Sequence, residues 1–382
     1  MLISIAFQAA GLFGTDGFLC PAPRCQEPSK EAARVQESPF PRHGRCAAAK
    51  GGAPGSGMLR TGHPRPFPVH AFFTDHFTLP LPAGHRFPMA KYGRLRERVQ
   101  ADLAEVRLTE PAPASDGVLA LAHHPGYIRR LVAGDLTPAE QRAIGFPWSP
   151  EMVERSRRST GATIDACRAA LRDGAAANLA GGTHHAFAAR GEGFCCFNDV
   201  AVAARLMQAE RRVCRVAIVD LDVHQGDGTA SILAGDPSVF TLSMHGERNY
   251  PFRKEASDLD VGLPDGTADG AYLDALALAL ATLRERFRPD LLIYLAGADV
   301  YQGDRLGRLS LSRDGVARRD ARVFEYALGL RLPVAVVMGG GYCPAIDDIV
   351  AIHLETVRQA ACHARSMAAA GFRTGDPPAT VG

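Results

Sequence analysis

The residues best suited to chemistry lie in one short segment, which reads Asp220-Leu-Asp222-Val-His224-Gln-Gly-Asp227-Gly. It follows the apolar run 216–219, which predicts a buried strand. Side chains two apart on a strand point to the same side, so Asp220, Asp222 and His224 should converge where the strand ends. Two carboxylates and an imidazole are costly to bury unless a cation pairs with them. The spacing therefore predicts a divalent metal, with zinc in a site of three protein ligands and one open position as the expected case.

Four other segments set glycines beside polar or aromatic residues, and most of them follow a predicted strand. They read Gly181-Gly-Thr-His184-His185-Ala-Phe187, Gly191-Glu-Gly193-Phe194-Cys-Cys-Phe197-Asn198-Asp199, Gly297-Ala298-Asp299 and Gly339-Gly340-Gly341-Tyr342. In open α/β sheets ligands bind outside the carboxyl ends of the strands, so we expect these segments to share one rim. A lone histidine or glycine run is usually structural, but this combination favours a site. Asp299 completes a candidate ligand set with Asp222 and His224.

The paired histidines and the two aromatic residues suit different tasks. His184 and His185 can hold different pKa values if their carboxylate neighbours differ, and can thereby divide the base and acid roles. Gly193 lets the Phe194 ring stand out from the backbone, where it would wall an apolar channel; the alternative is a core phenylalanine before a helix cap. The glycine run before Tyr342 leaves that phenol free to enter the site.

Strands that alternate with helices predict how these segments are positioned. We expect strands at 70–73, 118–121, 177–180, 216–219, 239–244, 291–295 and 334–338, and helices at 94–106, 159–171, 198–211, 271–287, 312–328 and 344–369. Loops 107–116 and 132–151 have no readable periodicity. The alternation predicts an α/β fold, a single three-layer αβα domain with a mostly parallel central sheet over residues 67–370.

The ends of the chain differ from this pattern. Residues 1–66 are rich in Gly, Pro, Ala and Arg and lack periodicity, so we expect them to be disordered, or an upstream extension with Met58 as the true start. Residues 371–382 are expected to form a flexible tail.

Composition excludes several classes of protein. The formal net charge is +2 and no block of Lys and Arg indicates nucleic-acid binding. No apolar run is long enough to span a membrane. The nine cysteines are scattered without repeated CxxC pairs, which favours reduced thiols in a cytoplasmic protein.

Taken together, the motifs resemble those of the zinc-dependent histone deacetylases of the arginase-like fold. Gly-Gly-Thr-His-His, Gly-Phe-Cys-x-Phe-Asn-Asp, Asp-x-Asp-x-His-x-Gly-Asp-Gly, Gly-Ala-Asp and Gly-Gly-Gly-Tyr occur in the family's order, across about residues 68–365. The Asp-Val-His-Gln run and segment 85–92 make the chain similar to class IV deacetylases and their bacterial relatives. The resemblance implies a metal-dependent amidohydrolase that uses metal-activated water to remove acetyl or longer acyl groups from lysine side chains.

The resemblance also implies roles for individual residues. Zinc would be held by Asp222, His224 and Asp299. His184 would pair with Asp220 and His185 with Asp227, and His185 would act as the general base and acid. Tyr342 would donate to the substrate carbonyl.

Two further features follow from the resemblance alone. Gly193 and Phe194 would line the acyl-lysine channel, and either Tyr250 or Phe252 would supply the second channel aromatic. A structural potassium ion would lie behind the zinc, held by backbone carbonyls and by Asp220, Asp222, His224 and Ser243.

Three alternatives remain open from the sequence. A two-manganese ureohydrolase would share the fold, but positions 226 and 301, where it needs carboxylates, are Gly226 and Tyr301. A non-catalytic module would bind acyl-lysine without turning it over. An acetylpolyamine or another small amide, rather than an acylated protein, would be a substrate of the same chemistry. The sequence does not predict an oligomeric state.

Overall fold

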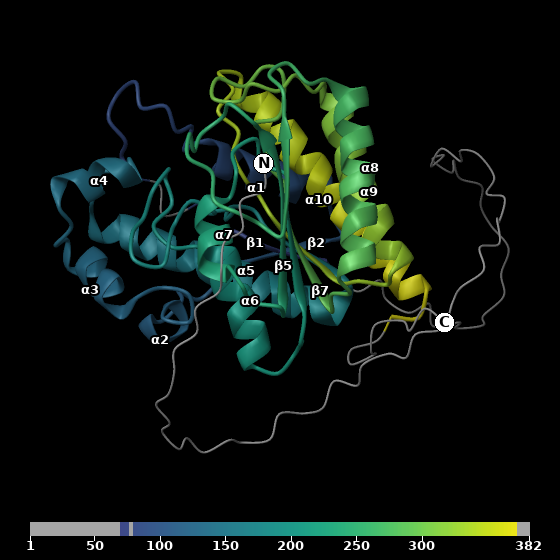
Figure 1. Cartoon of the computed structure of the whole chain (residues 1–382), viewed down its shortest axis with the longest axis horizontal. Coiled ribbons are helices and arrows are strands. Elements are labelled where there is room, and N and C mark those ends of the chain that lie inside the picture. Colours follow the sequence, from purple (N-terminus) through teal and green to yellow (C-terminus); the bar gives the residue numbers. More distant parts are fainter. Residues whose placement is uncertain (1–68, 76–78, 373–382) are drawn as a thin grey trace, which may run out of the picture. The chain divides into compact units, whose positions relative to one another are not determined.

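A computed structural model describes residues 69–75 and 79–372 (Figure 1). The predictions for residues 1–66, and for all but the first two residues of the tail 371–382, lie outside these ranges. The described strands form one eight-stranded sheet in the order β2-β1-β3-β8-β7-β4-β5-β6, and every neighbouring pair is parallel. The strands are β1 Val69–Phe72, β2 Val106–Thr109, β3 Ala175–Asn178, β4 Val216–Asp220, β5 Val239–Gly246, β6 Leu259–Leu263, β7 Leu291–Leu295 and β8 Val334–Val337.

Helices cover both faces of this sheet, which confirms the three-layer αβα architecture (Figure 1). One face carries α1, α8, α9 and α10, and the other carries α5 and α6. The helices are α1 Lys91–Asp102, α2 Asp116–Leu119, α3 Pro125–Ala133, α4 Pro138–Ile144, α5 Pro150–Asp173, α6 Asp199–Ala209, α7 Asp227–Leu233, α8 Asp269–Arg286, α9 Arg313–Gly329 and α10 Ile346–Ala369.

The central strands are buried on both faces because alternate side chains enter two different cores. In β4, Ala217 and Val219 pack into the core beneath α8, α9 and α10. Val216 and Ile218 enter the core on the α5 and α6 side. A parallel strand covered on both faces reads as a continuous apolar run, which is why these strands were recognisable in the sequence.

One predicted element was wrong, and two predicted helices have other bounds in the structure. Segment 118–121 belongs to the short helix α2 and its end, with Ser115 accepting from the backbone N–H of Val118. A four-residue apolar run cannot by itself separate a strand from a buried helical turn. The helix predicted at 94–106 spans Lys91–Asp102, and Val106 already belongs to β2. The helix predicted at 159–171 begins nine residues earlier, at Pro150 after the cap Ser149.

Helix α4 lies in a stretch that sequence periodicity left unassigned, yet its ends carry clear local signals. Thr137 and Glu140 form a capping box at its start, and Pro138 occupies the first helical position. Gly145 ends it in the left-handed conformation, with φ at 82°. The helix is too short for its periodicity to stand out, but it positions a residue of the site described below.

In the described ranges, no helix is both long and apolar enough to cross a membrane.

Candidate active site and metal centre

The candidate site lies at the carboxyl edge of four neighbouring strands, β3, β8, β7 and β4. The segments that begin at Gly181, Gly339, Gly297 and Asp220 leave these strands in that order. Segment 191–199 follows no strand; it instead leads into α6. The sheet thus brings together residues that lie up to 158 positions apart in the chain, from His184 to Tyr342.

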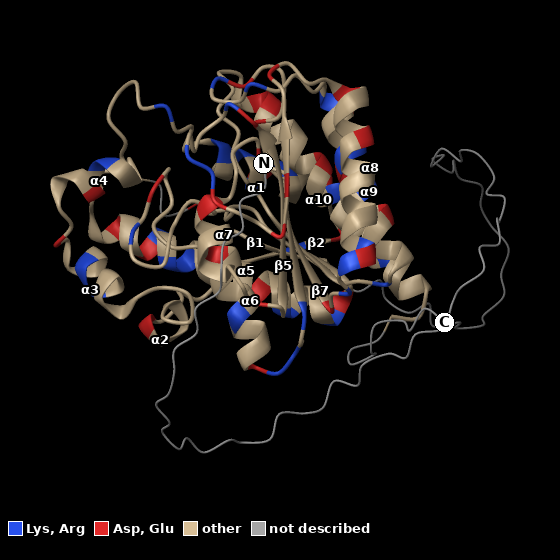
Figure 2. Cartoon of the chain, in the orientation of Figure 1, with Lys and Arg blue, Asp and Glu red and all other residues tan. Residues whose placement is uncertain are grey.

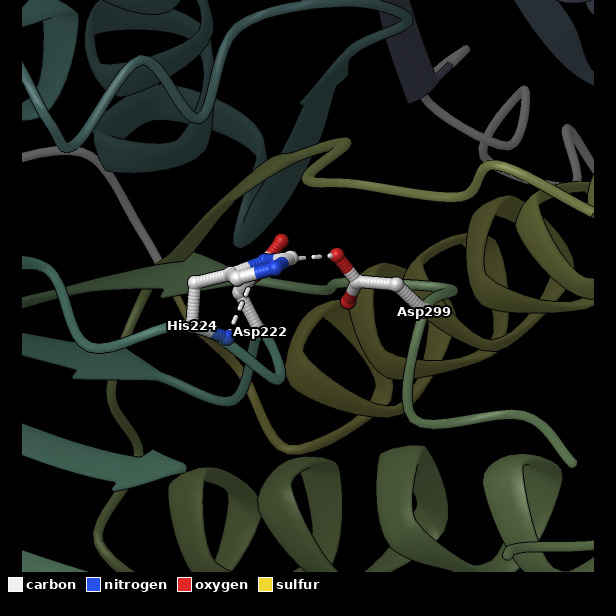
Figure 3. A group of neighbouring side chains, drawn as sticks. All are labelled: Asp222, His224 and Asp299. Atoms are coloured by element: carbon white, nitrogen blue, oxygen red, sulfur yellow. Dashed lines mark hydrogen bonds and ion pairs between the residues drawn. The ribbon is translucent and has the colours of Figure 1, made fainter. Parts of the chain in front are cut away.

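Three side chains form a group that can hold a metal ion. Asp222, His224 and Asp299 each offer one ligand atom, and these atoms all lie within 4.8 Å of one another. His224 Nδ1 lies 3.0 Å from Asp222 Oδ1 and 3.2 Å from Asp299 Oδ2 (Figure 3). All three side chains are buried.

The electrostatics of this group fit a cation. Asp299 Oδ2 makes no hydrogen bond within the described residues. Burial and the neighbouring Asp222 raise the pKa of Asp299 to about 7. Burial alone would lower the pKa of His224, but its contacts with Asp222 and Asp299 raise it to about 10. A metal ion would replace this proton, because metal ligands bind in their deprotonated forms.

The glycine run after β8 allows the backbone to approach these carboxylates. The N–H of Gly340 donates to Asp222 Oδ2 at 2.7 Å. A Cβ atom at Gly340 would lie 1.7 Å from Asp299 Oδ2, so no other residue fits there without rearrangement. The run therefore lets the backbone pass close to both carboxylates, Asp222 and Asp299.

The two histidines pair with two different aspartates, as the resemblance implies. His184 Nδ1 lies 2.7 Å from Asp220 Oδ2, and His185 Nδ1 lies 2.7 Å from Asp227 Oδ1. The two imidazole centroids are 4.2 Å apart. These contacts leave Nε2 of His185 free to meet a substrate in the cavity that this residue lines.

The two imidazoles have opposite pKa shifts. Burial lowers the pKa of His184, but the Asp220 carboxylate outweighs it and raises the value to about 9. Burial and the charge of His184 lower the pKa of His185 to about 4. His184 is therefore the cation of the pair, and His185 is the neutral proton acceptor.

Tyr342 lies beside the metal-binding group. Its ring centroid is 6.3 Å from that of His224, and burial raises the pKa of the phenol well above its usual value. The hydroxyl therefore stays protonated and can donate. The Tyr342 N–H donates to Asp304 Oδ2 at 2.5 Å, and Lys91 Nζ donates to the carbonyls of Gly340 and Gly341 at 2.7 and 3.3 Å.

A cavity of about 770 Å³ opens onto these groups. His185, His224 and Tyr342 line it, with Phe194 and Tyr250. The Tyr250 ring lies 5.0 Å from that of His185, and its hydroxyl donates to Glu192 Oε2 at 2.8 Å. Phe252 lies at the mouth and is 88% exposed. Tyr250 is thus the aromatic next to the histidine pair.

Phe194 is held in an unusual backbone conformation by α4. Its φ is 67°, which is uncommon for a residue with a side chain. The backbone N–H groups of Gly193 and Phe194 donate to the carbonyls of Ala143 and Ile144, at 3.0 and 2.8 Å. A Cβ atom at Gly193 would lie 2.6 Å from His185, so glycine permits the close approach.

Several supporting residues were missed from the sequence. They are His123, Gln225, Asp304 and Arg319. Arg319 is fully buried on α9 and donates to the carbonyls of Leu221 and Gly297, next to two of the ligands. The signal in the sequence is weak, because a single charged residue in a helix usually faces solvent.

Ser243 lies on β5 opposite Asp220 of β4 in the strand register. Its hydroxyl lies 3.0 Å from His245 Nδ1. The potassium site implied by the resemblance, on Asp220, Asp222, His224 and Ser243, stays a prediction.

Comparisons with known proteins agree with this architecture. The family model for the histone deacetylase domain matches residues 85–357. An uncharacterised protein of the cyanobacterium Picosynechococcus is 46% identical over 289 residues, which cover 75% of this chain and 96% of that protein. Histone deacetylase 2 of Arabidopsis thaliana is 33% identical, over 72% of this chain and 73% of its own.

A solved structure has a similar fold. The acetylpolyamine aminohydrolase of Burkholderia pseudomallei superposes with a TM-score of 0.60 at 25% identity, over 76% of this chain and 98% of its own. From the family model and these relatives, the chain belongs to the histone deacetylase family of hydrolases.

Proposed function

We propose that this protein is a zinc-dependent hydrolase that removes acetyl or longer acyl groups from lysine side chains. One observation carries the proposal. A metal-binding trio, two histidine–aspartate pairs and a tyrosine with a protonated hydroxyl meet at one cavity.

Asp222, His224 and Asp299 would hold the zinc ion. When bound there, zinc polarises a carbonyl oxygen and lowers the pKa of a coordinated water to about 7. Two aspartates and one histidine leave a coordination position open, which is typical of catalytic rather than structural zinc. A structural potassium ion behind the zinc, on Ser243 and the neighbouring aspartates, is part of the same proposal.

The chain's own residues would handle the protons and the developing charge. His185, neutral and oriented by Asp227, accepts the proton of the attacking water through Nε2 and returns a proton to the departing lysine amine. His184, protonated beside Asp220, supplies positive charge next to the reacting centre. The Tyr342 hydroxyl donates to the carbonyl oxygen as negative charge builds on it, an interaction worth about 3–4 kcal/mol for one donor.

The test is acetate release from a peptide that contains acetyl-lysine, with and without a hydroxamate inhibitor. We expect turnover by the zinc-loaded protein, inhibition by the hydroxamate, and loss of turnover in His185→Ala. If the wild-type protein bound the peptide without releasing acetate, it would be a binding module instead.

A second candidate substrate class is a small amide such as an acetylpolyamine. The similarity to the Burkholderia acetylpolyamine aminohydrolase favours it. Parallel assays with an acetylpolyamine and an acetyl-lysine peptide separate the two. The class IV-like relationship and a cytoplasmic location also belong to the proposal, and a fluorescent fusion tests the location.

A further inference from the structure

Arginines dominate the mouth of the catalytic cavity. Of the described residues that line it, four are arginines and none is Asp or Glu. The arginines are Arg86, Arg248, Arg305 and Arg308, and all are exposed. The loops at the end of the sheet toward which β5 points carry Lys and Arg as well as Asp and Glu (Figure 2), so the sign of the cavity depends on which of them line it.

Local carboxylates neutralise these arginines only in part. Arg308 pairs with Asp265 at 3.1 Å, and Arg248 lies 3.9 Å from Glu247. Neither Arg86 nor Arg305 forms an ion pair with a carboxylate in the described part of the chain. Behind the cavity floor, Asp222 and Asp299 lie in the metal-binding group and would balance the charge of a divalent ion. Asp227 there pairs with His185.

The positive excess of this cavity is not shared by the hollow that adjoins it. The adjoining hollow on the other side of Tyr250 and Phe252 is lined by Glu192, Asp227 and Glu255 as well as by two arginines. A general surplus of arginine on this face would give both hollows the same sign. Instead, of these two hollows only the cavity that leads to His224 and Tyr342 is lined by cations without carboxylates.

We infer that the substrate carries negative charge on the part that stays outside the channel, close to the scissile amide. The inference deepens the proposed deacylase function and rests on it. Either acidic residues that flank an acyl-lysine or the carboxylate of a small linear amide would supply this chemistry. A protonated polyamine would meet repulsion from the same four arginines.

The position of the arginines indicates which part of the substrate they contact. His185 and His224 at the floor are buried, whereas Arg248 and Arg308 have side chains 71% and 54% exposed. A charge at the far end of the acyl group would lie near the floor and miss the arginines. Exposed cations act mainly by attracting or repelling the approaching ligand, and salt screens this effect.

The experiment compares substrates that differ only in charge. Acetyl-lysine peptides with two flanking Asp, Ala or Lys residues form one series. 6-Acetamidohexanoate and N-acetylcadaverine form a second, since they share the amide and the five-carbon chain and differ in the terminal charge. We expect kcat/KM to fall by about tenfold or more from acidic to basic members, and the difference to shrink in high salt.

Matched variants assign the effect to the mouth. Arg86→Gln combined with Arg305→Gln removes the two arginines that form no ion pair among the described residues, and should bring kcat/KM for the acidic and basic peptides to within about twofold of each other. Arg322→Gln is the control, because Arg322 is also exposed, on α9, and does not line the cavity. It should keep the wild-type preference.

The outcomes separate the inference from the proposed function. A preference for the acidic peptides supports the inference, and if it is confined to the peptides it indicates a protein substrate. A preference for 6-acetamidohexanoate as well supports the inference and indicates that a small carboxylated amide is also accepted. Turnover of the neutral peptide with no charge preference, or with a preference for the basic members, overturns the inference and leaves deacylation standing. If no amide is hydrolysed, the proposed function fails and the inference with it.

Discussion

His184 and His185 are chain neighbours with opposite charge states, and the difference comes from their partners. Asp220 and Asp227 lie at equal distances from their respective imidazoles, 2.7 Å in each case. His184 gains its proton first because Asp222 adds a second carboxylate 3.9 Å from its Nε2. The resulting positive charge then disfavours a second one on His185. One protonated and one neutral imidazole are thus maintained at neutral pH.

The first prediction concerns the two groups that act on the substrate. Tyr342→Phe removes the hydroxyl that donates to the carbonyl oxygen, and His185→Ala removes the proton acceptor. Each should lower kcat by about 10²–10³-fold while leaving the bound metal in place, because neither side chain belongs to the ligand trio. Turnover assays combined with metal analysis check both halves. Wild-type turnover in either variant would contradict the assigned roles.

The second prediction concerns a ligand. Asp299→Asn keeps the shape of the side chain but removes the charge that faces His224, so zinc affinity should fall by at least about 100-fold. Competition with a chelator measures it. Asp265→Asn, a carboxylate outside the trio, is the control and should bind zinc like the wild type. Equal affinities in the two variants would rule Asp299 out as a ligand.

At the scale of elements, His123 joins two of the motif segments. Its Nδ1 lies 3.0 Å from the carbonyl of Phe187, and its Nε2 accepts from the N–H of Asn198 at 2.8 Å. Burial lowers the pKa of His123 from 6.5 to about 4. Protonation of the ring would put a proton on Nε2, which would then face the N–H of Asn198 instead of accepting from it.

The third prediction follows from this shift. Between pH 6.5 and 4 the unfolded chain binds a proton at His123 and the folded chain does not, so acid destabilises the fold, by about 3 kcal/mol over that range. The effect is absent above pH 6.5. The free energy of unfolding should fall between pH 7 and pH 5 by about 2 kcal/mol less in His123→Gln than in the wild-type protein. Urea unfolding at the two pH values measures it, and identical pH dependence in the two proteins would contradict the account.

The fourth prediction concerns Gln225, which anchors the wall of the cavity. Its amide donates to the carbonyl of Glu255 at 2.7 Å and to Asp260 at 2.8 Å, and it accepts from the Glu255 N–H at 3.0 Å. Gln225→Ala frees the segment that carries Tyr250 and Phe252. We expect KM for an acetyl-lysine peptide to rise several-fold with bound metal unchanged. Loss of metal with an unchanged KM would show instead that Gln225 supports the ligands.

The sequence predicted the elements that have strong periodicity or a complete apolar run. Burial on both faces requires a continuous apolar run, which made strands β4, β7 and β8 recognisable. The helical spacing of apolar residues did the same for helices α6, α8, α9 and α10. Helices α3 and α4 were missed because short helices depend on caps more than on periodicity. Strand β6 was missed because it is only partly buried and lies at the edge of the sheet.

For the molecule as a whole, the site could be predicted where chemistry and strand ends coincide. Asp222, His224 and Asp299 follow β4 and β7, which are neighbours in the sheet, so their convergence follows from the parallel topology. Lys91, Asp304 and the four arginines at the mouth could not be found this way. They come from loops and a helix start whose place in space is set by tertiary packing and leaves no periodic trace.

Amide hydrolysis by this protein should depend on a bound metal ion, and a zinc titration of the metal-free protein measures that dependence. Acetate release from a neutral acetyl-lysine peptide should rise with added zinc and level off at one equivalent per chain, since the described residues contain one such ligand trio. A plateau at two equivalents would favour a two-metal mechanism, and no acetate release at any zinc level would contradict the assignment.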